Sequence, residues 1–202
     1  MKLSSQLYLL RYGLVNDNRI FTHLTKEEKI SLHKILKYQK SFKSIVEIGS
    51  YYGSSSCFLA NGSAKEAKLF CIDTWKNHNM IGDRDDPNDI NLLPHDTFEV
   101  FLKNTNKYQK KIIPVRGWSY EVINLINKKI DKIDFLFIDG DHTYEGVKRD
   151  WSLYFPFLKT NSIVVFHDTA WAEGVQRVIA NDVVKVSVLI LELPNMKMFQ
   201  IQ

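Results

Sequence analysis

Short apolar segments rich in β-branched and aromatic residues alternate with amphipathic segments along most of the chain. This alternation limits its fold more than any other feature. The predicted strands cover residues 44–48, 69–72, 112–115, 133–138 and 163–166. The predicted helices cover residues 25–40, 54–61, 97–104, 119–127, 143–158 and 173–180. Such alternation is typical of a parallel sheet that is covered by helices on both faces.

Two further strands are predicted at the C-terminal end, over residues 183–191 and 196–201, with the turn signal Pro194-Asn195 between them. Strands that are joined by so short a turn run antiparallel to each other. One of them must therefore run against the remaining strands. We predict an α/β fold with a seven-stranded, mostly parallel sheet that contains one antiparallel strand and carries helices on both faces.

The length of 202 residues fits a single domain with a full hydrophobic core. We expect residues 44–202 to form this domain and residues 1–43 to form a helical segment packed on it. The helix of that segment begins at a capping box, in which Glu28 follows Thr25 at the required spacing. Residues 76–96 lack helical or strand periodicity, and a long irregular run inside a domain is often functional. We interpret them as a lid over the site; the alternative is a disordered surface insert.

The charge composition gives no sign of a nucleic-acid partner, because 27 Lys and Arg residues stand against 23 Asp and Glu residues without a basic cluster. Cys57 and Cys71 fall in predicted core segments, so no disulfide framework is expected and a reducing compartment fits. The N-terminal apolar run is too short for a signal peptide, and no segment is long enough for a membrane span. We expect a cytoplasmic protein.

Two neighbouring predicted strands end in carboxylates and imidazoles. The strand over residues 133–138 leads into Asp139, Asp141 and His142, and the strand over residues 163–166 leads into His167 and Asp168. The carboxyl ends of strands in an open α/β sheet are where ligands bind. Such side chains can ligate a divalent cation or move a proton, which favours a shared functional site. The alternative is that they cap helices and form turns.

The first predicted strand leads into Glu47-Ile-Gly49-Ser-Tyr-Tyr-Gly53-Ser-Ser. Gly49 permits a tight turn, and Gly53 permits close packing at the start of the next helix. The spacing lacks the middle glycine of the dinucleotide-binding pattern, which argues against NAD. The second strand ends at Asp73, near the distance at which an acid hydrogen-bonds a ribose. These residues favour a nucleoside without a phosphate, on whose base Trp75 could stack.

These motifs resemble those of class I S-adenosylmethionine-dependent O-methyltransferases of the catechol O-methyltransferase type. Glu47–Ser55 is similar to motif I of that family, and Gly117-Trp118-Ser119 to its adenine-contacting segment. Residues 135–150 with His167-Asp168 resemble more closely a bacterial branch, methyltransferase family 24, with macrocin O-methyltransferase-like and cephalosporin-hydroxylase-like proteins. The resemblance covers about residues 44–179 and implies a Rossmann-like fold that binds S-adenosylmethionine.

The resemblance also implies roles for individual residues. Glu47 and Gly49 would face the amino-acid part of the cofactor, Asp73 its ribose, and Ser119, with Trp118, its adenine. The full set expected to bind the cofactor is Glu47, Gly49, Ser50, Tyr51, Gly53, Ser54, Asp73, Thr74, Trp75, Gly117, Trp118, Ser119 and Asp139.

Asp139, His167 and Asp168 match the family's metal ligands, which would hold Mg²⁺ or Mn²⁺ and make Asp139 a catalytic residue. The histidine at 167 departs from the acid–amide or acid–acid pair of relatives, and imidazole suits softer metals than an all-oxygen site does. His142 stands where relatives carry a catalytic lysine, so we expect it to act as the general base.

We therefore expect an O-methyltransferase, assisted by a divalent metal, that acts on a hydroxyl of a sugar or another small molecule. A sulfonium methyl group is already activated, so the chemistry needed is deprotonation and orientation of that hydroxyl. The alternatives are an inactive S-adenosylmethionine-binding accessory protein and a metal-dependent oxygenase-like enzyme. Tyr51 and Tyr52 are the aromatic residues expected in the pocket. Residues 1–23 and the last two strands could form a homodimer contact, but nothing selects a dimer over a monomer.

Overall fold

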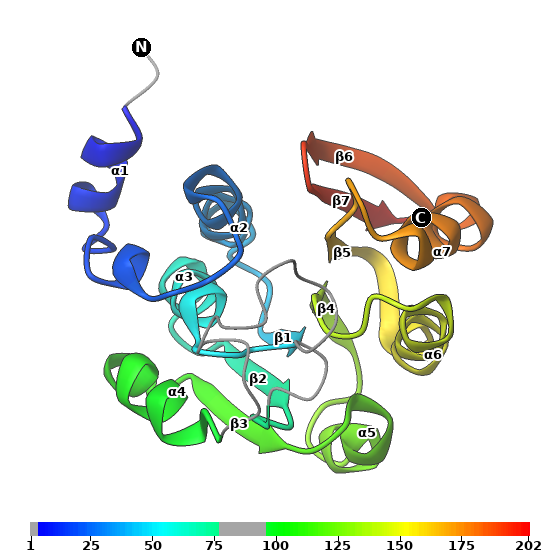
Figure 1. The fold of residues 1–202 in the computed structure, drawn as a ribbon, viewed down its shortest axis with the longest axis horizontal. Helices are drawn as coiled ribbons and strands as arrows, with labels where there is room; N and C mark the ends of the chain where they lie inside the picture. Colours follow the sequence, from blue (N-terminus) through cyan, green and yellow to red (C-terminus); the bar gives the residue numbers. More distant parts are fainter. Residues whose placement is uncertain (1–3, 77–95) are drawn as a thin grey trace, which may run out of the picture.

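The computed structural model describes residues 4–76 and 96–202, which contain a seven-stranded sheet flanked by helices (Figure 1). The strand order is β3-β2-β1-β4-β5-β7-β6. The strands are β1 (Ser44–Ile48), β2 (Lys68–Asp73), β3 (Ile112–Arg116), β4 (Ile133–Ile138), β5 (Leu158–His167), β6 (Ser187–Leu193) and β7 (Met196–Ile201). Strand β7 pairs antiparallel with both β5 and β6, and the remaining pairs are parallel. The predicted mostly parallel sheet with one antiparallel strand is confirmed.

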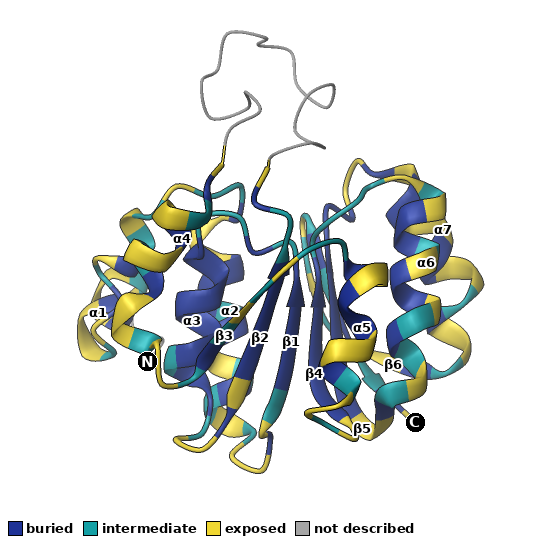
Figure 2. Cartoon of the chain, turned by 90° about the horizontal axis from the view of Figure 1, so that it is seen from below, coloured by how far each residue is buried: buried dark blue, intermediate teal, exposed yellow. Residues whose placement is uncertain are grey.

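The sheet separates two hydrophobic cores because its strands are apolar on both faces. The helices are α1 (Ser5–Arg11), α2 (Lys26–Tyr38), α3 (Ser54–Gly62), α4 (Phe98–Thr105), α5 (Ser119–Asn127), α6 (Tyr144–Tyr154) and α7 (Glu173–Asn181). Helices α2, α3 and α4 pack on one face, and α5, α6 and α7 on the other. The strands between these layers are largely buried (Figure 2).

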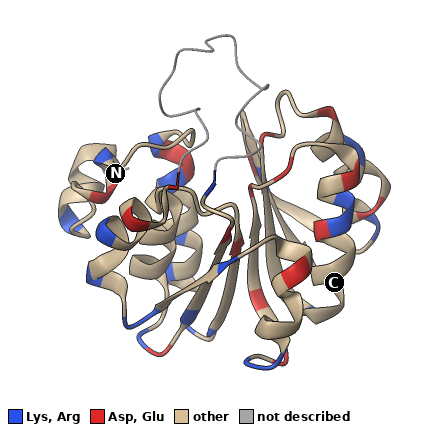
Figure 3. Ribbon diagram, turned by 60° about the horizontal axis from the view of Figure 1, so that its bottom comes forward, with Lys and Arg blue, Asp and Glu red and all other residues tan. Residues whose placement is uncertain are grey.

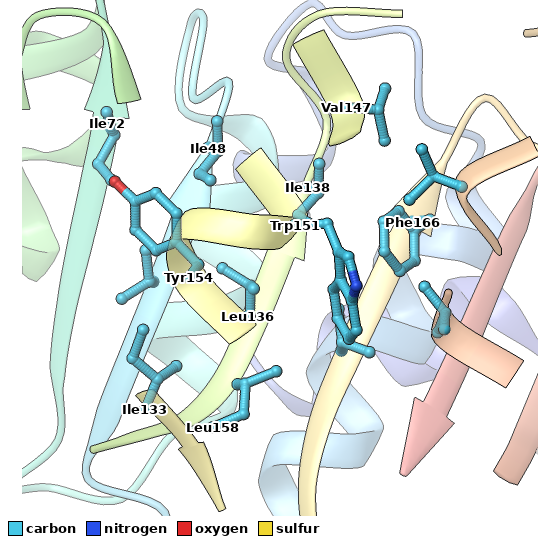
Figure 4. Close-up of a cluster of buried hydrophobic side chains, with 14 of the residues drawn as sticks. Ile48, Ile72, Ile133, Leu136, Ile138, Val147, Trp151, Tyr154, Leu158 and Phe166 are labelled. Carbon is cyan, nitrogen blue, oxygen red and sulfur yellow. The ribbon is translucent and has the colours of Figure 1, made fainter. Parts of the chain in front are cut away.

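Successive strand residues point to opposite cores, as the two-residue period of a strand requires. In β5, Ile163 and Val165 belong to the core under α2, whereas Val164 and Phe166 belong to the core under α6. Figure 4 shows Trp151 of α6 lying beside Phe166. The same alternation fixes where the residues that follow each strand can point.

Residues 4–14 pack against α2 and α3, and no local sequence pattern predicted how they do so. Tyr8 Oη lies 2.6 Å from His33 Nδ1, and His33 Nε2 lies 3.0 Å from Asn61 Oδ1 of α3. The amide of Asn61 donates in turn to the hydroxyl of Tyr108 at 3.0 Å. This buried polar chain ties α1 and α2 to the sheet domain. Helix α1 was not predicted, because residues 1–23 show only a weak periodic pattern.

Several element boundaries differ from the predicted ones. The helix expected over residues 143–158 ends at Tyr154 and continues as a 3₁₀ turn, because Pro156 cannot supply the amide that a longer helix needs. Strand β5 consequently begins at Leu158, before the predicted start. The first C-terminal strand begins at Ser187, because residues 183–185 form another 3₁₀ turn. The lid predicted over residues 76–96 lies almost entirely outside the described residues.

Acidic and basic residues are interspersed over the helices in the view of Figure 3, as expected from the modest net charge of +4. Within residues 4–76 and 96–202, no helix has both the length and the apolar character needed to cross a membrane.

Candidate functional site

A cavity of about 410 Å³ opens at the carboxyl ends of the central strands. Strands β2 and β4 flank β1, so the chain order reverses beside β1, and such a switch point is where open α/β sheets bind ligands. The walls come from the loops after β1, β2, β3, β4 and β5, and from residues 21–24 before α2. The position of the cavity agrees with the site predicted from the strand ends.

The loop after β1 forms the floor of the cavity. Gly49 has a φ of +89°, and a Cβ there would lie only 2.0 Å from the backbone oxygen of Asp139. A glycine is therefore needed for the β1 loop to pass against the end of β4. Gly53 has a φ of +82°, and a Cβ would lie 2.6 Å from Thr105 Cγ2. The turn predicted at Gly49 and the close packing predicted at Gly53 are both confirmed.

Asp73 at the end of β2 holds this loop and also faces the cavity. One carboxylate oxygen accepts the backbone N–H of Tyr51 at 2.8 Å, and the other accepts the N–H of Trp75 at 2.6 Å. Burial raises the pKa of Asp73, while these N–H groups act against the rise. Each carboxylate oxygen keeps further acceptor capacity, which suits the hydroxyl groups of a ribose.

Ser119 and Asp150 line the far end of the cavity. The Ser119 hydroxyl at the start of α5 donates a short hydrogen bond to Asp150 of α6, and the Tyr154 hydroxyl donates to the Ser119 carbonyl at 2.9 Å. Burial raises the pKa of Asp150 to about 6, although the Ser119 hydrogen bond and the Arg149 charge lower it. A carboxyl group with such a pKa can accept or donate a hydrogen bond near neutral pH.

An acid–imidazole cluster lies where β4 and β5 end. The donor atoms of Asp139, His142 and Asp168 all lie within 4.8 Å of one another. His142 Nε2 is 2.8 Å from Asp168 Oδ2. Asp168 also accepts from the Trp171 indole at 2.8 Å and from the Asn195 amide at 2.9 Å. This set fits a divalent cation, and it equally forms a His–Asp pair that could transfer a proton.

His167 lies behind this cluster rather than in the cavity wall. It follows Ile163 and Val165 on the face of β5 that is turned toward α2, so its ring is buried against Glu28. Its Nδ1 is 3.0 Å from Asp139 Oδ1, and its Nε2 is 3.5 Å from Glu28 Oε2. Burial alone would lower the pKa of His167, but the neighbouring carboxylates raise it to about 12.

The three residues whose donor atoms lie together are Asp139, His142 and Asp168. The predicted ligand set, which was Asp139, His167 and Asp168, differs from them by one residue. Both nitrogens of His167 face carboxylates, and His167 is not one of those three residues. His142 occupies the third position instead. The aspartates still meet as predicted, since both leave their strands toward the same edge.

Most of the residues predicted to bind the cofactor line the cavity, and three do not. Those in the wall are Gly49, Ser50, Tyr51, Ser54, Asp73, Thr74, Gly117, Trp118, Ser119 and Asp139. Gly53 is buried at the N-terminus of α3, close to Phe101 and Thr105 of α4. Glu47 is buried and accepts the hydroxyls of Ser50 and Ser56, and burial raises its pKa.

Trp75 was expected to stack on the base, and that expectation is wrong. Its indole is fully buried against Phe98 and Phe101, and it donates to the Tyr51 carbonyl at 2.9 Å. A φ of +53° turns its side chain into the core. The indole therefore supports the β1 loop from below.

Several wall residues were not predicted. They are Phe21, Thr22, His23, Leu24, Arg149 and Asp150. Arg149 and Asp150 could have been found, because they lie in the helix that follows the predicted site residues Asp139 to His142. Residues 21–24 carry no local signal, since only the packing of the N-terminal segment brings them to the sheet edge.

Comparison with known proteins assigns the chain to a family. Residues 46–169, more than half of the chain, match the model of a methyltransferase domain family, family 24. The chain belongs to this methyltransferase family. It is 28% identical over 130 residues to the uncharacterized protein y4gI of Sinorhizobium fredii, covering 63% of this chain and 13% of that protein. It is 29% identical over 137 residues to the uncharacterized protein R132 of Acanthamoeba polyphaga mimivirus, covering 65% and 53%. The matched part of this chain thus spans about half or less of the length of these relatives.

Solved structures confirm the methyltransferase fold. The O-methyltransferase TomG from Streptomyces achromogenes, in complex with S-adenosylmethionine, aligns with a TM-score of 0.67 and 12% identity over 100% of this chain and 91% of that one. The O-methyltransferase NovP aligns with a TM-score of 0.67 and 14% identity over 98% and 100%. The O-methyltransferase from Bacillus cereus, in complex with S-adenosylhomocysteine, aligns with a TM-score of 0.64 and 12% identity over 99% of this chain and 92% of that one. The predicted resemblance to class I O-methyltransferases is confirmed in family and fold.

Proposed function

We propose that this protein is an S-adenosylmethionine-dependent O-methyltransferase that acts on a hydroxyl of a small molecule. The observation that carries the proposal is the cavity at the switch point, which joins the Asp73 carboxylate to the Asp139, His142 and Asp168 cluster. S-adenosylmethionine supplies an activated methyl group on a positively charged sulfur. The family and the fold neighbours support this cofactor.

The cavity residues fit this cofactor chemically. The hydroxyl oxygen of Ser54, at the start of α3, is buried in the wall and has no hydrogen-bond partner among the described residues, so a ligand can satisfy it. Asp73 suits a ribose, and Ser119 with Asp150 suits the amino and ring nitrogens of an adenine. The several carboxyl groups of the wall favour a cation over a phosphate.

We assign His142 as the general base and Asp168 as the residue that orients it. With Nε2 donating to Asp168, the neutral ring carries its basic lone pair on Nδ1, which takes the proton of the acceptor hydroxyl. The Asp168 carboxylate stabilises the imidazolium that forms, and the indole of Trp171 and the amide of Asn195 hold that carboxylate in place. Such proton transfer contributes roughly 10²–10⁴-fold to a rate.

A divalent cation, Mg²⁺ or Mn²⁺, is a second proposal for the same cluster, which the convergence of three donor atoms favours. Asp139, Asp168 and His142 would hold it. When bound, the cation supplies a Lewis acid that lowers the pKa of a hydroxyl. In that case His142 serves as a ligand, and the base is a different group.

Calorimetric titration of S-adenosylhomocysteine tests the cofactor. We expect binding by the unchanged protein and about 10–100-fold weaker binding by Asp73→Ala, because a hydrogen bond to a charged group contributes about 1.5–3 kcal/mol. Asp131→Asn, at an exposed position, is the control and should bind normally. Lack of binding by the unchanged protein would make the inactive accessory protein the better hypothesis.

The role of His142 is tested by transfer of a labelled methyl group from S-adenosylmethionine to catechol as a probe acceptor, with chelator or with Mg²⁺. If His142 is the general base, the His142→Ala variant should bind S-adenosylhomocysteine normally and lose methyl transfer in both conditions. Normal turnover in this variant would end the assignment. Binding of Mn²⁺ alone, lost in Asp139→Asn and His142→Ala, would support the cation site.

A further inference from the structure

Part of the cavity wall is aromatic. Phe21 and His23 come from the segment before α2, Tyr52 from the loop after β1, and Trp171 from the loop before α7. Phe21 is 39% exposed and Trp171 is 52% exposed, although both side chains are large and apolar. Binding pockets for small molecules are typically lined by such exposed aromatic side chains.

Phe21, His23, Tyr51 and Tyr52 pack together into one surface, which we name the aromatic wall. The rings of Tyr51 and Tyr52 are stacked, with centroids 4.0 Å apart and planes at 11°. Phe21 meets each of them edge-on at 6.1 Å and meets His23 edge-on at 5.3 Å. The rings therefore support one another and present an already formed surface to the cavity.

The N-terminal segment that carries Phe21 is fastened on its far side. The carboxylate of Asp17 accepts the hydroxyl of Tyr108 at 2.7 Å and pairs with the ammonium of Lys107 at 2.8 Å. On the near side, the backbone N–H of Leu24 donates to the hydroxyl of Thr22 at 3.2 Å. The Asp17 contacts fasten the segment to Lys107 and Tyr108, and the Thr22 hydroxyl stabilises a turn within it, so ligand binding need not order this segment first.

The charge of the cavity restricts what can lie against the wall. Among the described residues that line it, the carboxyl groups are those of Asp73, Asp139, Asp141, Asp150 and Asp168. The one guanidinium among them, that of Arg149, lies 4.2 Å above the ring of Tyr120. A phosphate or carboxylate on the acceptor would meet more like charges than opposite charges.

We propose that the aromatic wall binds the methyl acceptor, and that this acceptor is a hydroxyl compound without an anionic group, whose ring has an apolar face. The ring stacks on the wall through an apolar face, and a hydroxyl of the same ring reaches His142 and Asp139. A phenolic ring and a pyranose ring both have this chemistry. The assignment of the acceptor rests on the methyltransferase function proposed above, whereas binding of a neutral ring does not.

The test uses two pairs of probes that differ only in a carboxylate. Catechol is compared with 3,4-dihydroxybenzoate, and methyl β-glucopyranoside with methyl β-glucuronopyranoside. Dissociation constants are measured by ligand-observed NMR, with chelator and saturating S-adenosylhomocysteine. We expect one neutral ring to bind about tenfold or more tightly than its anionic counterpart. The neutral ring that binds identifies the acceptor as phenolic or carbohydrate.

Phe21→Leu removes the ring but keeps an apolar side chain, and Phe157→Leu, in the 3₁₀ turn after α6, is its control. We expect Phe21→Leu to raise the dissociation constant of the neutral probe about fivefold, the scale of one aromatic contact. Phe157→Leu should leave that dissociation constant unchanged. S-adenosylhomocysteine should bind both variants equally. Equal weakening in the two variants, tighter binding of the anionic probes, or no binding of either neutral ring would overturn the proposal.

Failure of this inference can be told apart from failure of the proposed function. If S-adenosylhomocysteine binds but neither ring does, the methyltransferase function stands and the aromatic wall is not the acceptor site. If a neutral ring binds in a Phe21-dependent way but S-adenosylhomocysteine does not bind at all, the wall is a ligand site and the methyltransferase function is wrong.

Discussion

Asp150→Asn should stabilise the protein at neutral pH and lose that effect in acid. Asp150 is 2% exposed, and burial raises its pKa from 3.8 to about 6. In the unfolded chain the same carboxyl group ionises near its ordinary pKa. The folded state therefore holds the proton more tightly, so the stabilisation from Asp150 is present in full below about pH 4 and is lost as the pH rises through 6.

The size of the effect follows from the displaced pKa. A change from 3.8 to about 6 corresponds to about 3 kcal/mol, at about 1.36 kcal/mol for each pKa unit. An asparagine keeps an oxygen that can accept the Ser119 hydroxyl but has no charge to bury. Relative to wild type, the free energy of unfolding of Asp150→Asn should therefore rise by about 3 kcal/mol between about pH 4 and pH 8. In a chain of this length that equals a difference of roughly 6–12 °C in Tm at pH 8.

Urea unfolding of the two proteins across this pH range measures the difference directly. Other buried carboxyl groups also titrate, but they do so in both proteins and cancel in the comparison. Asp131→Asn, at an exposed position, is the matched control and should give a difference that stays nearly flat with pH. Parallel curves for Asp150→Asn and wild type would refute the reasoning, because they would mean that Asp150 ionises alike in both states.

Two further predictions concern residues beneath the cavity. Gly49→Ala should lower the free energy of unfolding by about 3 kcal/mol or more, through its φ of +89° and the clash of a Cβ with the end of β4. Gly13→Ala, with a φ of +66° and open space, should cost only about 1 kcal/mol; equal losses in urea unfolding would exclude the clash. Glu28→Gln keeps the helix cap but removes the negative charge beside His167. The pKa of His167 should therefore fall, as measured by NMR titration of its ring. Glu27→Gln, an exposed neighbour, should leave that pKa unchanged.

The strands and the convergence of Asp139 with Asp168 could be predicted because their signals are local. An apolar run that stops at a carboxylate marks both the strand and the edge at which it ends. His167 could not be placed in the same way. Its position depends on which face of β5 it shares, and this became evident only when Ile163 and Val165 were seen to pack under α2.

The aromatic part of the site could not be predicted, for a related reason. Phe21 belongs to a segment without periodicity, and its place at the cavity depends on the contacts of that segment with Asn61 of α3 and with Tyr108. Trp75 was predicted to contact the ligand because it stands close to Asp73 in the sequence. Its backbone conformation buries the ring instead. Local patterns identified the chemistry of the site but not the tertiary contacts that shape it.

The contact between Glu28 and His167 joins parts of the chain that are made at very different times. Helix α2 is synthesised early, whereas β5 follows only after most of the sheet has been made. During synthesis on the ribosome, Glu28 must therefore wait without its partner while β1 to β4 emerge. The acid–imidazole cluster can form only once β5 is in place, because His167 ends that strand and Asp168 follows it.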